Sequence, residues 1–264
     1  MNVLCAGAAQ GLVKALQGVF LEFTGARIHS SFGSVGALRD AFLAGEPCDV
    51  LIVTSPLVAE LQATGRLLPG SDGMLGRVRT ALAMRGESER PDVSTPEGLK
   101  QALLAASAVY CPDIERSTAG SHFGAVLREL GITDLVAPRL RCRPNGTDAM
   151  RDLAADPSPG AIGCAQITQI RYTPGIGLLG ALPPQFELAM VYGAAVSTRA
   201  AHPEHARRFV ELMTGARTRV MRTQVGFEPL PSAAADSGCI PLAAGVGFAR
   251  AQGEVAVGGA GFFR

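Results

Sequence analysis

Two short segments near the start of the chain place free backbone amides where an anion could bind. They are Val3-Leu4-Cys5-Ala6-Gly7-Ala8-Ala9-Gln10 and Ser30-Ser31-Phe32-Gly33-Ser34-Val35-Gly36. Each has the pattern of a strand that runs into a helix. The first N–H groups of a helix have no partner within it, and the helix dipole adds partial positive charge there. Both turns therefore predict a place for a negatively charged group.

We expect five residues of these turns to contact a ligand: Ala8, Ala9, Gln10, Ser34 and Val35. The Ser34 hydroxyl could donate to a ligand carboxylate or could cap the helix that follows, and one serine can do both. Gln10 could face the ligand or could cover the surface of its helix.

The most polar stretch at a predicted strand end runs from Pro112 to His122. Ligands of open α/β sheets bind at such strand ends. Ser117 and Thr118 could donate hydroxyls, although one of them could instead cap the next helix. Arg116 could form a forked pair with a carboxylate, or it could be a solvated loop charge.

Gln166 follows a buried strand, and its uncharged amide suits a hydrogen bond to a ligand oxygen. Tyr192 could lie on a later strand and face either a cleft or the core.

The elements that must position these residues alternate between strand and helix. Apolar runs predict strands at 2–6, 27–32, 49–53, 77–85, 106–111, 136–142, 161–167, 176–182 and 187–196. Helical spacing of apolar residues separates most of them, and Thr147 is expected to cap one of these helices. Alternating units of this kind predict right-handed crossovers and mainly parallel sheets. Two such units in tandem suggest an α/β protein with two lobes and a cleft between them.

Composition narrows the function. The chain has 264 residues, 47% hydrophobic and 18% charged, with a formal net charge of +1 and no tryptophan. That charge gives no general attraction to nucleic acid or to a membrane surface. No apolar segment is long enough to insert into a membrane. None of the six cysteines forms a C-x-x-C pair, so we expect buried thiols, no metal and no cofactor. The first strand begins near Asn2 with no leader before it, which predicts a cytoplasmic protein, or a periplasmic one if a leader was removed.

The order of several motifs resembles the molybdate-binding-protein-like branch of the type II periplasmic substrate-binding proteins. The segments that carry the resemblance, spread from about Asn2 to Pro229, are Ala6-Gly7-Ala8, Phe32-Gly33-Ser34-Val35-Gly36-Ala37-Leu38, Ala44-Gly45-Glu46-Pro47-Cys48-Asp49-Val50, Ala119-Gly120, Ala161-Ile162-Gly163 and Gly226-Phe227-Glu228-Pro229.

The resemblance implies two α/β lobes that close on a ligand. Lobe one would comprise residues 1–81 and 195–230, and lobe two residues 82–194. Hinges would lie near 80–83 and 192–196. Residues 231–264 would form an irregular extension.

The chain departs from this branch where the branch binds tetrahedral oxyanions through hydroxyl groups. The two serines of that branch correspond to Ala8 and Val35 of this chain, and the tyrosine of that branch corresponds to Leu188 or Ala189. The backbone donors expected around Ala119 and Ala165 could remain. Each missing partner of a buried oxyanion costs about 1–3 kcal/mol. We therefore expect a larger cavity, lined by Ala8, Val35 and Leu188, for a partly apolar organic acid.

Two functions remain open. The first is a binding protein for a small organic anion, with the membrane component of an ABC transporter as a partner. The second is a cytoplasmic isomerase of an unsaturated polycarboxylic acid, because the same branch is similar to aconitate isomerase. That reaction needs a base and an acid, for which Glu115, His122 and Tyr192 are candidates.

Overall fold

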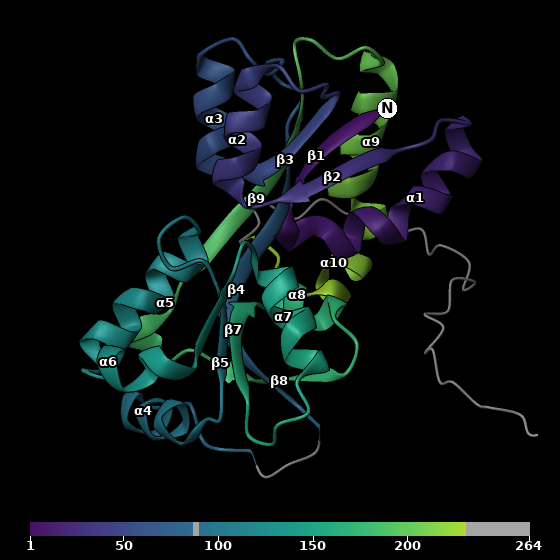
Figure 1. Cartoon of the computed structure of the whole chain (residues 1–264). Helices are drawn as coiled ribbons and strands as arrows, with labels where there is room; N and C mark the ends of the chain where they lie inside the picture. The colour runs from purple at the N-terminus through teal and green to yellow at the C-terminus, as the bar shows by residue number, and fades with distance from the viewer. Residues whose placement is uncertain (87–89, 231–264) are drawn as a thin grey trace, which may run out of the picture. The chain divides into compact units, whose positions relative to one another are not determined.

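The structure of the chain, a computed structural model, describes residues 1–86 and 90–230 (Figure 1). Strands and helices alternate along most of this length, as the sequence predicts. The expected irregular extension, 231–264, lies outside the described residues. In the described part of the chain, no helix combines the length and the apolar character needed to cross a membrane.

Within the described residues, nine strands form one sheet in the order β2-β1-β3-β9-β4-β7-β5-β6, and β8 pairs with β4 beside this path. The strands are β1 (Asn2–Ala6), β2 (His29–Gly33), β3 (Val50–Thr54), β4 (Gly73–Arg85), β5 (Val109–Pro112), β6 (Leu140–Arg143), β7 (Ile162–Gln166), β8 (Ile176–Ala181) and β9 (Ala189–Val196).

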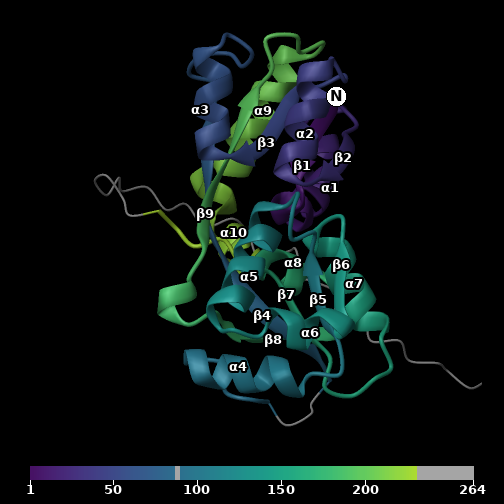
Figure 2. The same ribbon diagram turned by 60° about the vertical axis from the view of Figure 1, so that its left-hand side comes forward.

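Helices pack on both ends of this sheet. In both views α1, α2, α3 and α9 surround the first strands, and α4 to α8 surround β5 and β7 (Figures 1 and 2). The helices are α1 (Gln10–Thr24), α2 (Val35–Ala44), α3 (Ser55–Ala63), α4 (Pro96–Ala105), α5 (Thr118–Glu129), α6 (Thr133–Val136), α7 (Gly146–Ala155), α8 (Ile167–Tyr172), α9 (Pro203–Thr214) and α10 (Arg219–Val225), with short 3-10 turns at η1 (Gly7–Ala9), η2 (Ala137–Arg139), η3 (Pro184–Phe186) and η4 (Ala216–Thr218).

The sheet is mixed. β1 pairs in parallel with β2 and β3, and β5 pairs in parallel with β6 and β7. β4 and β9 are antiparallel to each other, and each is antiparallel to its other neighbours. The first part of β4, Gly73 to Arg79, pairs with β9, whereas Thr80 to Met84 pairs with β7. The predicted parallel strands thus occupy the outer parts of the sheet, and two long strands link them through an antiparallel centre.

The buried apolar side chains form three clusters that divide along the same line. The first contains Phe20, Phe42 and Phe209, and it draws on residues up to Val78 and from Tyr192 onward. The second packs around α4 and α5, and the third packs around α7 and α8; both use residues between 81 and 186. The packing therefore changes near the boundaries proposed for two lobes, and the division into lobes stays a prediction.

One predicted strand, 136–142, is wrong in its first half. Thr133–Val136 is a short helix and Ala137–Arg139 is a 3-10 turn, so the strand begins only at Leu140. Ile132 and Val136 are both fully buried one helical turn apart, and the Val136 amide donates to the Ile132 carbonyl oxygen (3.0 Å). Buried apolar residues four positions apart lie on one face of a helix, whereas a half-buried strand buries every second residue. The burial of Ile132 and Val136 therefore favours a helix here.

The five cysteines of the described residues are free thiols, and all but Cys142 are buried. Cys111 and Cys142 face each other on β5 and β6 with their sulfur atoms 3.7 Å apart. Burial raises the pKa of Cys48 to about 12. Burial raises the pKa of the other three buried thiols, Cys5, Cys111 and Cys164, as well. The four buried thiols are therefore protonated and poorly nucleophilic at neutral pH, which agrees with the structural role expected for them.

Candidate functional site

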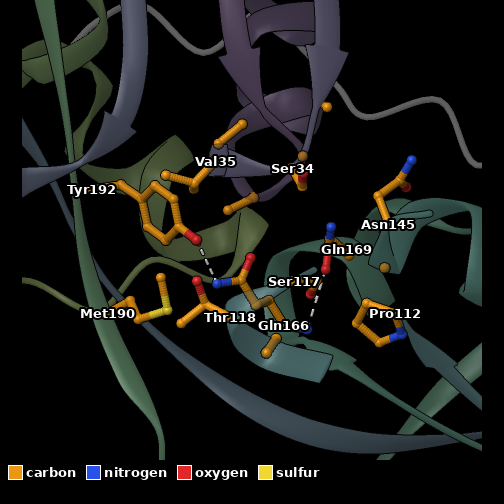
Figure 3. A pocket seen from close by; sticks show the side chains of 16 residues that line it. Ser34, Val35, Pro112, Ser117, Thr118, Asn145, Gln166, Gln169, Met190 and Tyr192 are labelled. Carbon is orange, nitrogen blue, oxygen red and sulfur yellow. Dashed lines mark hydrogen bonds between the residues drawn. The ribbon is translucent and has the colours of Figure 1, made fainter. Parts of the chain in front are cut away.

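A small cavity of about 40 Å³ lies where the ends of several strands meet the starts of several helices (Figure 3). We call it the central cavity. Its wall comes from β1 and η1, from the β2–α2 turn, from the β5–α5 loop, from the start of α7, from the β7–α8 turn and from β9. The residues that line it are Ala6, Gly7, Ala8, Gly33, Ser34, Val35, Pro112, Ser117, Thr118, Ala119, Asn145, Gly146, Gln166, Gln169, Met190 and Tyr192.

Three helices of ten or more residues begin at this wall, and the capping residue of each lines the cavity. Ser34 Oγ accepts from the Ala37 amide (3.3 Å), and Ser117 Oγ accepts from the Gly120 amide (3.1 Å). Each cap satisfies one of the free amides of its first turn. The remaining amides and three helix dipoles favour negative charge in the cavity.

The third helix, α7, is capped by Asn145, whose Oδ1 accepts from the Asp148 amide (3.0 Å). The prediction that Thr147 caps this helix is wrong, because Thr147 lies inside the first turn and is buried. An asparagine followed by Gly146 starts the helix two residues earlier and brings its first turn to the cavity wall.

Tyr192 and Gln166 join across the cavity floor. Gln166 Nε2 donates to the Tyr192 hydroxyl oxygen (2.6 Å) from β7 to β9 (Figure 3). The hydroxyl proton of Tyr192 therefore stays free to donate to a ligand. Burial raises the pKa of Tyr192 to about 12. At neutral pH this residue is a hydrogen-bond donor and not a base.

Gln169 fills a space that two glycines leave open. A Cβ on Gly7 would lie 2.7 Å from Gln169 Nε2, and a Cβ on Gly146 would overlap the same amide. Gln169 Oε1 accepts from the Gln166 amide (3.3 Å), and its Nε2 donates to Thr147 Oγ1 (3.5 Å). This side chain therefore connects the starts of η1, α7 and α8, and it reduces the volume of the cavity.

The wall of the central cavity carries no ionised side chain at neutral pH. Its polar groups are backbone amides, hydroxyls and side-chain amides, which donate hydrogen bonds without bringing a compensating charge. Among the described residues, no group of three or more His, Cys, Asp or Glu is placed to hold a metal ion. The chemistry that this wall supports is the binding of a small anion through neutral donors.

The structure brings together eight of the fourteen residues proposed from the sequence. Those that line the central cavity are Ala8, Ser34, Val35, Ser117, Thr118, Ala119, Gln166 and Tyr192. Their contact with a ligand stays a prediction.

The remaining six lie elsewhere. Ala9 is fully buried, Gln10 is the first residue of α1, and neither lines the cavity. Ala165 is also buried, and it pairs with Ala81 inside the sheet. Arg116 lines a second cavity, described below.

The two other proposed acid–base residues do not reach the cavity either. Glu115 is exposed. His122 Nε2 donates to the Phe186 carbonyl oxygen (2.7 Å), which occupies that nitrogen. Both belong to the polar segment from Pro112 to His122 that was predicted to bind the ligand. In that segment, Ser117 and Thr118 line the cavity, whereas Glu115 and His122 do not.

One expectation about hydroxyl donors needs correction. A tyrosine hydroxyl is present at the site, because Met190 and Tyr192 share one face of β9 and both line the cavity. Leu188 and Ala189, the two positions given for the lost hydroxyl, do not line it. Ala8 and Val35 line the cavity together with Gln169, Met190 and Tyr192, and a cavity larger than that of the molybdate-binding branch stays a prediction.

Sequence reasoning missed Asn145, Gly146, Gln169 and Met190, which also line the cavity. A local pattern was available for two of them, since an asparagine and a glycine directly after a strand are typical of a helix start. Gln166 and Gln169 form a capping box at the start of α8, a spacing that the sequence displays as glutamine three residues after glutamine.

A sequence model of the bacterial extracellular solute-binding proteins matches residues 1–228 of the chain. The chain belongs to this family. The match agrees with the resemblance predicted from the sequence motifs, and it spans all six wall segments of the central cavity.

Among curated proteins, this solute-binding protein is similar to an aconitate isomerase from a Pseudomonas species, with 23% identity over 244 residues and 88% of each chain covered. Among solved structures, it is similar to the periplasmic molybdate-binding protein of Azotobacter vinelandii, with 20% identity, a TM-score of 0.71, and 88% of this chain and 100% of that chain covered. It is also similar to the sulfate-binding protein of Mycobacterium tuberculosis, with 16% identity, a TM-score of 0.65, and 87% of this chain and 86% of that chain covered. These structural similarities establish a periplasmic-binding-protein fold.

Proposed function

We propose that this solute-binding protein binds a small organic anion and holds one of its carboxylate groups in the central cavity. The observation that carries the proposal is the meeting of three helix N-termini with a wall of neutral donors. Such a wall stabilises an anion through oriented dipoles. It offers no positive side chain that would attract anions without regard to shape.

The lining of the cavity favours a carboxylate over a tetrahedral oxyanion. Ala8 and Val35 present apolar groups on one side of the wall, where an oxygen of a tetrahedral anion would lack a partner.

The proposal includes a closing motion. Residues 1–81 with 195–230 would move as one lobe and residues 82–194 as the other, about hinges in β4 and β9. This division is supported by the apolar clusters, which separate near the same positions. The family is described as extracellular, and a membrane component of an ABC transporter is the partner that such a binding protein would serve.

Thermal unfolding with a panel of anions tests the proposal. Acetate, succinate and tricarballylate should each raise the melting temperature, whereas molybdate and sulfate should not. A ligand at 100 times its Kd stabilises the folded state by about 2.7 kcal/mol, which corresponds to about 5–10 °C for a domain of this size. Stabilisation by molybdate or sulfate alone, or by none of the five anions, would contradict the proposal.

The affinity should also be insensitive to pH near neutrality. Tyr192, with its pKa raised to about 12, is the titratable side chain that lines the central cavity, so it stays a donor across the neutral range. For succinate, which is almost fully ionised above about pH 7, the Kd should change less than about twofold up to about pH 9. Titration calorimetry at several pH values measures this. A tenfold step within that range would reveal an ionising group in the binding site.

An isomerase of an unsaturated polycarboxylic acid is the second candidate. The similarity to an aconitate isomerase over 88% of both chains favours it. The central cavity offers Tyr192 as a proton donor but neither a carboxylate nor an imidazole as a base. NMR spectra of cis- and trans-aconitate in heavy water with the protein would decide: deuterium incorporation or isomerisation would establish catalysis, and neither is expected for a binding protein.

A further inference from the structure

A second cavity, of about 710 Å³, adjoins the central one. We call it the outer cavity. Ser34 lines both cavities, so they meet at the start of α2. The residues that line the outer cavity are Ser34, Gly36, Ala37, Asp40, Asp113, Arg116, Cys142, Arg143 and Pro144.

Three parts of the chain contribute to both walls. Gly33–Val35 lines the central cavity, and the next turn of α2 lines the outer one. The β5–α5 loop contributes Ser117 to the first and Arg116 to the second. The β6–α7 connection likewise contributes Asn145 to the first and Arg143 to the second. The proposed ligand would pass along these shared segments to extend from one cavity into the other.

The two cavities differ in the groups that line them. The central cavity is lined by neutral groups, whereas the outer cavity is lined by two guanidinium groups and two carboxylates. Arg143 is held in place by an ion pair with Asp152 and by a hydrogen bond from its Nη1 to the Cys142 carbonyl oxygen (2.9 Å). Arg116 is exposed and forms no ion pair with any described residue.

Two carboxylates share the outer wall and limit where a negative group could lie. Asp113 Oδ1 accepts from the amides of Glu115 (2.8 Å) and Arg116 (3.0 Å). These bonds lower the pKa of Asp113, so it is charged at neutral pH. Asp40 projects from the exposed side of α2. A second anionic group of a ligand would be repelled by both carboxylates and attracted to the two guanidinium groups.

We propose that the outer cavity binds the distal carboxylate groups of a di- or tricarboxylate, through Arg116 and Arg143, while the first carboxylate lies in the central cavity. This inference rests on the proposed function and specifies its ligand class. The outer cavity, of about 710 Å³, offers room for the part of a polycarboxylate that lies beyond its first carboxylate.

Titration calorimetry with acetate, succinate and tricarballylate tests the assignment. Wild-type affinity should rise in that order. Arg116→Gln should lower the affinity for tricarballylate at least tenfold, which is the effect expected for a lost hydrogen bond between charged groups. The same substitution should leave the affinity for acetate unchanged. Arg128→Gln is the matched control, because Arg128 is an exposed arginine in α5, the helix that follows the Arg116 loop, and lines neither cavity. The Arg128→Gln variant should bind all three acids with wild-type affinity.

Asp40→Asn gives an independent check, because it removes a repelling charge and should strengthen tricarballylate binding but not acetate binding. If the three acids bind equally, or if Arg116→Gln weakens all three alike, the outer cavity is not the distal site and the proposed function still stands. If none of the three acids binds the wild-type protein, the proposed function itself is wrong.

Discussion

Replacing Thr118 with aspartate should abolish anion binding without unfolding the protein. Thr118 is the first residue of α5, is exposed, and lines the central cavity. An acid in the first turn of a helix is favourable by about 0.3–1 kcal/mol, so the fold should be retained. A carboxylate at this position would repel a bound anion: at about 4 Å, two like charges interact by about 4 kcal/mol in an effective dielectric of 20.

Some of that repulsion is screened by solvent, so we expect a loss of at least about 100-fold in affinity, or about 3 kcal/mol. Ser121→Asp is the matched control, since Ser121 is an exposed residue one turn later in α5 and does not line the cavity. Calorimetric titration of succinate into both variants measures the difference. Retained affinity in the Thr118 variant would place the anion elsewhere.

Replacing Gly120 with alanine should disturb both stability and binding. A Cβ on Gly120 would overlap the Asp113 carbonyl group and would lie 2.6 Å from the Pro112 carbonyl oxygen. These are backbone atoms, so no side chain can rotate away. Overpacking typically costs about 1–3 kcal/mol, and we expect the upper end of that range, about 3 kcal/mol.

The shift would also move the start of α5, because the Gly120 amide donates to Ser117 Oγ. Urea unfolding followed by circular dichroism measures the loss of stability. Gly18→Ala is the control: no atom lies within 4 Å of a Cβ at that helical glycine, so alanine there should stabilise by about 0.5–1 kcal/mol. Equal stability of the Gly120 variant and the wild type would show that α5 does not need this close approach.

The parts of the site that follow from local patterns could be predicted from the sequence. A capping residue after an apolar run places Ser34 and Ser117 at strand ends, and both line the cavity. Asn145 has the same pattern, but Thr147, two residues later, is also a favoured capping residue by type. The residues around the start of α7 therefore indicated a helix start correctly, but the prediction of which residue caps the helix was wrong.

The parts that depend on distant contacts could not be predicted in this way. The direction of Tyr192 follows from the register of β9 with β3 and β4, which pairs it with Thr54 on one side and Gly76 on the other. Gln169 reaches Gly7 across most of the chain. Counting lost hydroxyls at Ala8 and Val35 therefore overlooked the polar side chains that β9 and α8 bring to the cavity, Tyr192 and Gln169.

Tyr192 gives the protein an intrinsic optical label. The chain has no tryptophan and three tyrosines, so its near-ultraviolet emission comes from tyrosine alone. One of these fluorophores, Tyr192, lies in the cavity wall, where its hydroxyl accepts a hydrogen bond from Gln166. Tyr110 is hydrogen-bonded to Asp156 and does not line the cavity. Occupation of the central cavity therefore changes the surroundings of an emitting group directly, and binding can be followed without attaching a dye.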